Sequence, residues 1–142
     1  MQSPDYSSIS FPPSVSVTEQ EINISSLTNT QKQFYIDLFK EVIEFYISRQ
    51  TSRIIVGLAG PAGSGKSVIA AIFHEIAKQL KLPFRFETVG IDAFHYKNDF
   101  LLNHTADGEP LKAHKGRFDT YDVKKLSEAL EAFSTGEEVS LP

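Results

Sequence analysis

Apolar residues recur at helical spacing in the first third of the chain. Phe34, Leu38, Val42 and their neighbours follow an i, i+3, i+4, i+7 pattern, which predicts an amphipathic helix. Thr30 and Gln33 have the spacing of a capping box, so the helix is expected to begin at Thr30 and to end near Arg49. Its aromatic stripe is expected to pack on a sheet, and a ligand pocket is the alternative.

Two further helices are predicted downstream. One begins after Gly65 and carries an apolar face as far as Leu80, and Pro83 ends the pattern. The other begins at Asp122 as N-cap, and Thr135-Gly136 supplies its stop signal. Its apolar face consists of Val123, Leu126, Leu130 and Phe133.

Apolar runs at residues 54–56 and 84–91 have the composition of strands. The order strand, helix, strand predicts a βαβ unit within a parallel, doubly wound α/β sheet. A third strand is expected to start at residue 139. Residues 1–27 are rich in Ser and Pro and are interpreted as an N-terminal tail or edge strand. The main domain is then expected to span residues 28–142.

The stretch from Gly60 to Ser67 matches the phosphate-binding pattern G-x-x-x-x-G-K-[ST], between a predicted strand and a predicted helix. Glycines let backbone N–H groups approach phosphate oxygens closely, and the helix start attracts the same charge. A glycine-rich turn that contains lysine by chance is the alternative. The predicted nucleotide-binding residues are Gly60, Pro61, Ala62, Gly63, Ser64, Gly65, Lys66, Ser67 and Val68.

The chemistry of this pattern predicts ATP and Mg²⁺ as ligands. Lys66 would bring a cation to the β- and γ-phosphates, and the Ser67 hydroxyl would ligate Mg²⁺. Asp92 follows the second predicted strand, and ligands in such folds bind at the carboxyl ends of the strands. The Asp92 carboxylate could accept a proton from a substrate hydroxyl or orient the metal, or it could cap a turn or helix.

The segment between Lys97 and Gly116 is polar and irregular. Lys112 and Lys115, together with the adjacent Arg117, form a small basic cluster. This cluster is expected either to contact substrate or phosphate or to belong to a solvated loop. The histidines at 95, 104 and 114 fit no zinc-binding spacing and are interpreted as ordinary loop residues. Asp107-Gly108-Glu109-Pro110 predicts a turn.

Composition narrows the class of protein. The 142 residues are 41% hydrophobic with a formal net charge of -4, which gives no sign of a nucleic-acid-binding surface. The chain has no cysteine, no apolar run of membrane-spanning length and no signal-peptide pattern. We therefore expect a soluble, cytoplasmic protein without nucleic-acid or membrane partners, whose oligomeric state the sequence leaves open.

Three blocks together resemble the phosphoribulokinase/uridine kinase group of P-loop kinases. They are the phosphate-loop block at residues 57–67, Val89-Gly90-Ile91-Asp92-Ala93-Phe94-His95-Tyr96, and the block at residues 115–123, which is similar to K-G-x-P-E-T-F-D-V. The branch that the chain resembles most contains bacterial pantothenate kinase and nucleoside/nucleotide-kinase-like proteins. The resemblance implies a three-layer P-loop NTPase fold with the third strand between the first two.

By this resemblance Asp92 is the catalytic base and Lys66 the catalytic cation. The candidates for substrate binding are His95, Tyr96, Lys115 and Tyr121. The implied activity is transfer of the ATP γ-phosphate to a hydroxyl of a small molecule such as a nucleoside, pantothenate or a sugar.

Departures from the family pattern leave alternatives open. Ala93 replaces a usual Gly, and Arg117-Phe118-Asp119 replaces an apolar-Pro-Glu sequence. Family members continue beyond the position of Pro142 into an arginine-bearing lid, so only the N-terminal portion of the kinase fold is expected. A truncated, catalytically silent nucleotide-binding fragment is the first alternative. A P-loop GTPase or motor-type ATPase is less favoured, because no Asn-Lys-x-Asp or D-x-x-G motif is present.

Overall fold

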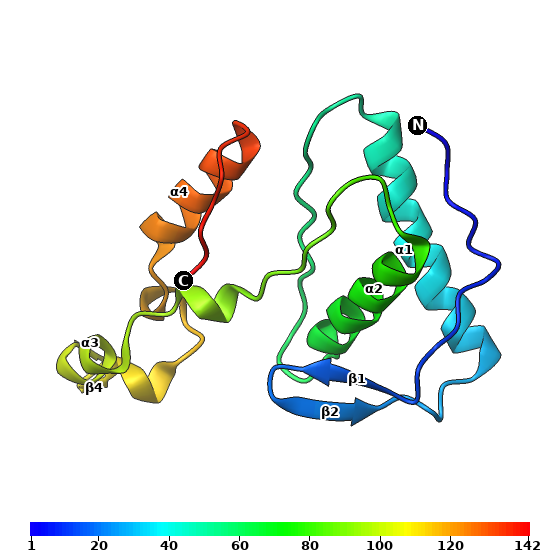
Figure 1. The fold of residues 1–142 in the computed structure, drawn as a ribbon. Coiled ribbons are helices and arrows are strands. Elements are labelled where there is room, and N and C mark those ends of the chain that lie inside the picture. Colours follow the sequence, from blue (N-terminus) through cyan, green and yellow to red (C-terminus); the bar gives the residue numbers. More distant parts are fainter. The chain divides into compact units, whose positions relative to one another are not determined.

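The computed structural model describes every residue from Met1 to Pro142. The chain divides into two compact units, Met1–Thr88 and Val89–Pro142, whose elements are labelled along the chain in Figure 1. Each unit is described by itself. None of the helices combines the length and the apolar character needed to cross a membrane.

Helix α1 (Asn29–Ser48) begins at a capping box formed by Thr28 and Gln31. The Gln31 N–H donates to Thr28 Oγ1 at 3.2 Å, and the Thr28 N–H donates to Gln31 Oε1 at 2.8 Å. The sequence pattern predicts this box at Thr30 and Gln33, and that prediction is wrong. Both pairs have the required spacing, but the earlier start leaves Leu27 packed against the core ahead of the helix.

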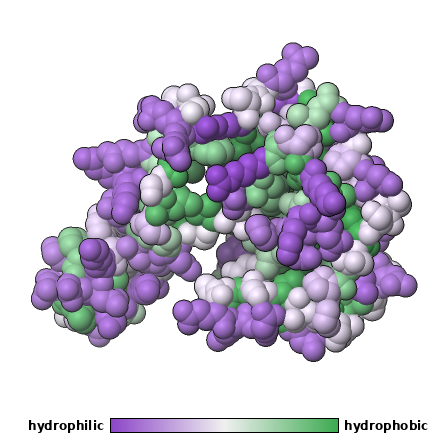
Figure 2. Space-filling view, in the orientation of Figure 1, coloured by the Kyte–Doolittle hydropathy of each residue, from purple (hydrophilic) through white to green (hydrophobic).

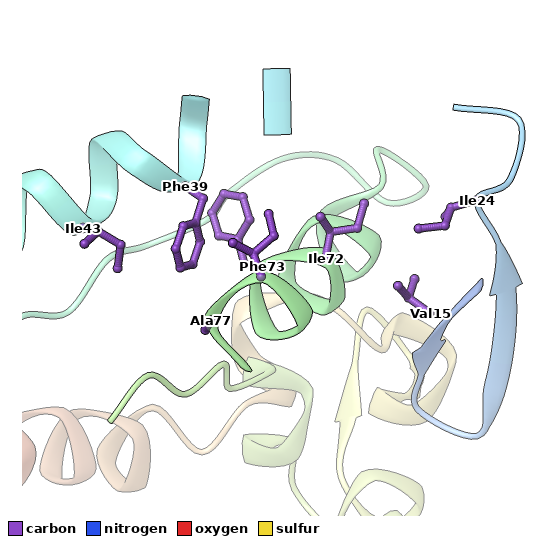
Figure 3. Close-up of a cluster of buried hydrophobic side chains, with 8 residues drawn as sticks. Val15, Ile24, Phe39, Ile43, Ile72, Phe73 and Ala77 are labelled. Carbon is purple, nitrogen blue, oxygen red and sulfur yellow. The ribbon is translucent and has the colours of Figure 1, made fainter. Parts of the chain in front are cut away.

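The core of the first unit lies between α1 and α2 (Lys66–Leu80). Phe39 and Ile43 of α1 are 0% and 1% exposed, and Figure 3 shows Phe39 directed toward Phe73 of α2. The apolar stripe predicted for α1 is therefore buried at Phe39 and Ile43, whereas Phe34 at its start is 59% exposed. The buried part packs against another helix and not against a sheet. The α2 helix ends at Leu80, in agreement with the stop predicted before Pro83.

A short hairpin completes this core. Strands β1 (Ser14–Val17) and β2 (Gln20–Asn23) pair antiparallel. Val15 and Ile24 are 6% and 5% exposed, and Figure 3 shows both beside Ile72 of α2. The sequence shows this hairpin only as weak alternation, because each strand is too short to repeat its inward-facing position more than once.

The segment ahead of the hairpin is also attached to α2. The Ser10 N–H donates to Gln79 Oε1 at 3.0 Å, and Gln79 Nε2 donates to the Ser10 carbonyl at 2.7 Å. Residues 1–27 are thus part of the first unit. This differs from the tail preceding a single domain that the sequence predicts, and the division of the chain falls at Thr88–Val89 instead.

The segments predicted as strands at 54–56, 84–91 and 139–141 form no strand in the structure. A strand requires a neighbour that accepts and donates its backbone hydrogen bonds, and none of these segments has one. Phe84 and Phe86 instead contact α1, with ring centroids 4.6 Å from Tyr46 and 5.3 Å from Phe39. The only sheets are two-stranded and antiparallel, and the parallel sheet of the P-loop fold stays a prediction.

Apolar side chains of two of these segments reach the surface. Ile55, Val56, Val89 and Ile91 of these segments are 50%, 55%, 48% and 55% exposed, and the nearby Leu58 is 47% exposed. Hydrophobic residues, in green, are visible among hydrophilic ones on the face shown in Figure 2. Exposure of several large apolar residues in one segment is uncommon for a surface loop, where such residues usually occur singly.

The second unit is built from short elements. In chain order they are η1 (Ile91–Phe94), α3 (Asn98–Asn103), β3 (Thr105–Ala106), β4 (Glu109–Pro110), η2 (Leu111–His114), η3 (Phe118–Thr120) and α4 (Val123–Ser134). Strands β3 and β4 pair antiparallel around the turn predicted at Asp107-Gly108. The α4 prediction is confirmed, because Asp122 Oδ1 accepts from the Lys125 N–H at 3.0 Å and the helix stops before Gly136.

Candidate active site

The segment from Gly60 to Gly65 is an exposed turn that leads directly into α2. The Ser64 N–H donates to the Pro61 carbonyl at 3.2 Å, which closes the turn. Gly63 and Gly65 have φ values of +74° and +89°, a region that side chains with a Cβ rarely adopt. No side chain caps the start of α2, so its first N–H groups point out of the helix without a capping oxygen.

Lys66 closes over this loop. Its Nζ donates to the carbonyl oxygens of Gly60 at 2.6 Å and Pro61 at 2.8 Å, and lies 3.5 Å from Ser64 Oγ. All three acceptors are uncharged, and Lys66 forms no ion pair. An anionic oxygen would be a stronger partner than these carbonyls. The ammonium is thus held at the loop with its charge uncompensated.

The remaining loop residues fit a close approach of phosphate. A Cβ on Gly60 would lie 2.8 Å from Ser64 Oγ, so the backbone there leaves no room for a side chain unless Ser64 moves. Pro61, Ala62 and Ser67 are exposed. The Val68 side chain packs against the core. Only the backbone N–H of Val68 could therefore donate a hydrogen bond to a ligand.

Taken together, these groups suit a polyphosphate. They supply an uncompensated ammonium, outward-pointing N–H groups and the exposed Ser67 hydroxyl. No group of three or more His, Cys, Asp or Glu side chains could hold a metal ion by itself. Mg²⁺ keeps much of its coordination for phosphate oxygens and water, so one hydroxyl ligand from Ser67 fits an ion that arrives with the nucleotide.

Asp92 lies in η1 of the second unit, with its side chain 86% exposed. The Tyr121 hydroxyl donates to Asp92 Oδ1 at 3.4 Å. His95 Nδ1 lies 3.7 Å from the same oxygen and 3.0 Å from the Asp92 carbonyl. No side chain caps the start of η1 or of the next helix, α3, so the Asp92 carboxylate caps neither helix. The capping alternative is not realised.

His95 is the buried member of this group, with its side chain 8% exposed. Its ring stacks on Tyr121 with centroids 3.9 Å apart and planes at 26°. A carbonyl can only accept, so the contact with the Asp92 carbonyl requires the proton on Nδ1. Nε2 of the neutral ring is then an acceptor, and it is buried without a hydrogen-bond partner.

Backbone contacts join the two blocks that the sequence analysis singled out. The Tyr96 N–H donates to the Thr120 carbonyl at 3.0 Å, and the Asp122 N–H donates to the Phe94 carbonyl at 2.7 Å. Between them, His95 and Tyr121 form an antiparallel bridge. The segment 92–96 and the segment 120–122 are therefore adjacent, as a shared site requires.

Thr120 is a member of this site that sequence reasoning missed. Its side chain is 0% exposed. Thr120 Oγ1 donates to the Arg117 carbonyl at 2.6 Å and accepts from the Gly116 N–H at 3.1 Å. These bonds fix the turn ahead of Tyr121. The only signal in the sequence is a threonine among charged and aromatic residues, which does not reveal a buried hydroxyl.

The other two predicted substrate-binding residues form no hydrogen bond or ion pair with Asp92. Tyr96 stacks on Phe100 with centroids 4.2 Å apart, and Lys115 is exposed. The structure thus brings together Asp92, His95 and Tyr121 from the predicted set.

Arg117, from the predicted basic cluster, is used within the unit. Its guanidinium donates to Asp107 at 2.8 Å and to Asp119 at 3.0 Å. The hydrogen bond and the charge of Arg117 lower the pKa of Asp107 from its ordinary value. Arg117 therefore ties the β3–β4 turn to η3, and its charge is not free for a phosphate.

The Tyr121 hydroxyl is the titratable group whose pKa the cluster changes. Burial raises the pKa of the phenol first, and the negative charge of Asp92 and the hydrogen bond to it raise the pKa further. The phenol therefore remains a protonated donor at neutral pH. The phosphate loop belongs to the first unit, and this cluster belongs to the second.

An open cavity of about 280 Å³ lies at the C-terminal end of α2. It is lined by His74, Ala77, Lys78, Lys81, Leu82, Phe84 and Phe86. None of these residues belongs to the loop from Gly60 to Ser67, so the cavity is separate from the candidate phosphate site.

Two curated proteins are similar to the chain. The protein named "Uncharacterized kinase mug58" of Schizosaccharomyces pombe is 31% identical over 121 residues, covering 78% of this chain and 40% of that protein. The protein named "Uncharacterized protein YggC" of Escherichia coli is 35% identical over 86 residues, covering 60% of this chain and 34% of that protein. The chain thus spans two fifths or less of the length of these relatives. The first similarity is consistent with a kinase-like function.

No family model matches the chain, and no solved structure matches it.

Proposed function

We propose that this chain carries the phosphate-binding part of an ATP-dependent kinase that transfers the γ-phosphoryl group to a hydroxyl of a small molecule. The observation that carries the proposal is the position of Lys66, whose ammonium is held over the Gly60 and Pro61 carbonyls without a counter-charge. Similarity to a protein named as a kinase supports the same class of reaction.

In this proposal the loop holds the nucleotide and the metal. The Lys66 ammonium exchanges the neutral carbonyls for β- and γ-phosphate oxygens, which bind a cation more strongly. The N–H groups at the start of α2 bind phosphate oxygens along the helix axis. The Ser67 hydroxyl would hold Mg²⁺, and the bound ion would neutralise charge on the triphosphate.

Asp92 serves the acceptor in the same proposal. The acceptor hydroxyl gives its proton to the Asp92 carboxylate while its oxygen forms a bond to the γ-phosphorus. The bond from that phosphorus to the β–γ bridging oxygen breaks, and ADP leaves with the bonding electrons. Such a transfer depends on positioning of the reacting groups and on charge stabilisation.

The family proposal is narrower and rests on the second unit. The D-x-F-H-Y block and the K-G…D-V block favour the phosphoribulokinase/uridine kinase group over P-loop proteins in general. Their backbone contacts at Phe94–Asp122 and Tyr96–Thr120 support this assignment, because blocks that act at one substrate should be adjacent. The parallel P-loop sheet belongs to this proposal too.

The test is a transfer assay on the full chain with γ-labelled ATP and Mg²⁺. Pantothenate, uridine, ribose and glycerate are offered separately as acceptors, because the candidate site residues do not select among them. We expect labelled product with at least one acceptor and its loss in Lys66→Ala and in Asp92→Asn. Lys78→Ala, an exposed lysine on the same helix, serves as control and should leave the rate unchanged.

The outcomes separate the competing functions. ATP binding that needs Lys66, with no product from any acceptor, would support a nucleotide-binding protein without transfer activity. Label transfer that survives Lys66→Ala would exclude the loop as the nucleotide site.

A further inference from the structure

We propose that Tyr121 is a positioning residue for Asp92. Its hydroxyl holds one oxygen of the carboxylate, so that the other oxygen is presented to the acceptor hydroxyl. This inference rests on the proposed kinase function. It gives Tyr121 a role through Asp92, in place of the direct substrate contact that the sequence suggests.

Asp92 needs such a support because little else restrains it. Its side chain is 86% exposed, and an exposed carboxylate samples several rotamers. A general base acts only when its oxygen lies within hydrogen-bond reach of the proton that it removes. Small losses of alignment between reacting groups reduce the rate strongly, so a donor that selects one rotamer favours catalysis.

Tyr121 is itself firmly placed. Its ring stacks on His95 at 3.9 Å, and the His95 ring is nearly buried and linked to the Asp92 carbonyl at 3.0 Å. The backbone bridge between His95 and Tyr121, together with the bond from the Asp122 N–H to the Phe94 carbonyl, fixes the register of the two segments. The phenol oxygen therefore has a defined position relative to Asp92.

The chemistry distinguishes Tyr121 from His95. His95 directs its Nδ1 proton to the backbone carbonyl at 3.0 Å, and its distance of 3.7 Å to Asp92 Oδ1 exceeds a hydrogen bond. The Tyr121 hydroxyl at 3.4 Å is within reach of Oδ1, and contacts of this kind commonly shorten when the reacting complex forms. Burial and the charge of Asp92 raise the pKa of the phenol, so it remains a donor through the neutral range.

The variant Tyr121→Phe keeps the ring on His95 and removes only the hydroxyl. In the transfer assay, with the acceptor that gives the highest rate, we expect kcat to fall about three- to tenfold. KM for ATP should stay unchanged, because the phosphate loop is untouched. Tyr35→Phe removes a hydroxyl from the first unit and serves as control. An unchanged kcat in a folded Tyr121→Phe chain would overturn the proposal.

A second measurement follows the contact without any activity. The full chain is labelled with ¹³C at the tyrosine ring carbon that bears the oxygen, and the Tyr121 signal is assigned by its loss in Tyr121→Phe. Asp92→Asn removes the negative charge that raises the pKa of Tyr121, so this signal should titrate at lower pH in Asp92→Asn than in the wild type. Identical titration curves would show that the hydroxyl does not contact the carboxylate.

The two failures are distinguishable. If the wild-type chain transfers phosphate and Tyr121→Phe transfers it equally well, the positioning role fails and the kinase proposal stands. If the wild-type chain transfers phosphate to no acceptor, the kinase proposal fails and the positioning role fails with it, whatever the titration shows.

Discussion

Phe39 of α1 and Phe73 of α2 meet edge to face, with ring centroids 5.3 Å apart and planes at 80°. Phe39 also contacts Phe86 at 5.3 Å. One side chain thus joins three segments of the first unit: the two helices and the extended stretch after α2. Aromatic pairs in this arrangement contribute beyond the apolar area that they bury.

Replacing Phe39 by Ala should therefore destabilise the chain strongly. The side chain is 0% exposed, and removing a buried Phe costs about 3–5 kcal/mol through lost burial and the cavity that remains. Phe45→Ala on the same helix, where the ring is 46% exposed, should cost less than about 1.5 kcal/mol. Urea unfolding followed by circular dichroism measures both. Equal costs would contradict a core between α1 and α2.

The start of α1 gives a sharper comparison between two threonines. Thr28→Ala should lower the free energy of unfolding by about 1 kcal/mol, because Thr28 Oγ1 accepts from the Gln31 N–H. Thr30→Ala lies within the first turn and should change stability little or raise it slightly, since Ala has the higher helix propensity. Thermal unfolding of the two variants decides the matter. A larger loss from Thr30→Ala would restore the sequence-based N-cap.

Lys66 and Asp92 should differ in their effect on nucleotide binding. ATP with Mg²⁺ should raise the melting temperature of the wild-type chain by mass action. Lys66→Ala should abolish this shift because it removes the ammonium over the loop, whereas Asp92→Asn should keep most of it. Differential scanning fluorimetry with and without EDTA measures the shift. Equal shifts in the wild type and Lys66→Ala would count against a nucleotide at this loop.

Acid should release the contact between Arg117 and Asp107. The pKa of Asp107 is lowered in the folded chain by Arg117. Its contribution to stability is therefore complete above the unfolded pKa, about 3.9 for Asp, and is lost as pH falls through the lowered folded value. The stability difference between wild type and Arg117→Gln should shrink below about pH 4.

Urea midpoints measured from pH 3 to pH 7 test this dependence. Lys124→Gln, which breaks an exposed pair with Glu128 on α4, is the control. A difference between wild type and Arg117→Gln that stays constant across this range would show that the guanidinium does not act through Asp107.

Local patterns predicted the end of α2 and both ends of α4, but they placed the start of α1 at the wrong threonine. The parallel sheet stays a prediction. The stop at Leu80 and the N-cap at Asp122 depend on residues within one or two turns, and such signals are complete in the sequence. The segments at 54–56 and 84–91 have strand composition, but pairing depends on a distant neighbour, and the structure pairs neither. Composition alone cannot supply that neighbour.

In the candidate site too, features that are local in sequence were predictable and contacts between distant residues were not. The glycine loop and Lys66 follow one another along the chain, so their geometry could be anticipated from the motif. The contact between Tyr121 and Asp92 could not, because it depends on the backbone bridge between residues far apart in sequence. Thr120 was missed for a different reason: its bonds to Gly116 and Arg117 are local, but a threonine in a polar turn gives no sign that its hydroxyl is buried.

The bonds between Ser10 and Gln79 have a practical consequence for laboratory work. A shortened protein that begins just before the glycine loop would lack Val15 and Ile24, whose side chains cover α2. The shortened protein would expose the face of α2 that Val15 and Ile24 cover in the full chain. Poor yield or precipitation would then report the missing cover, and not a defective motif.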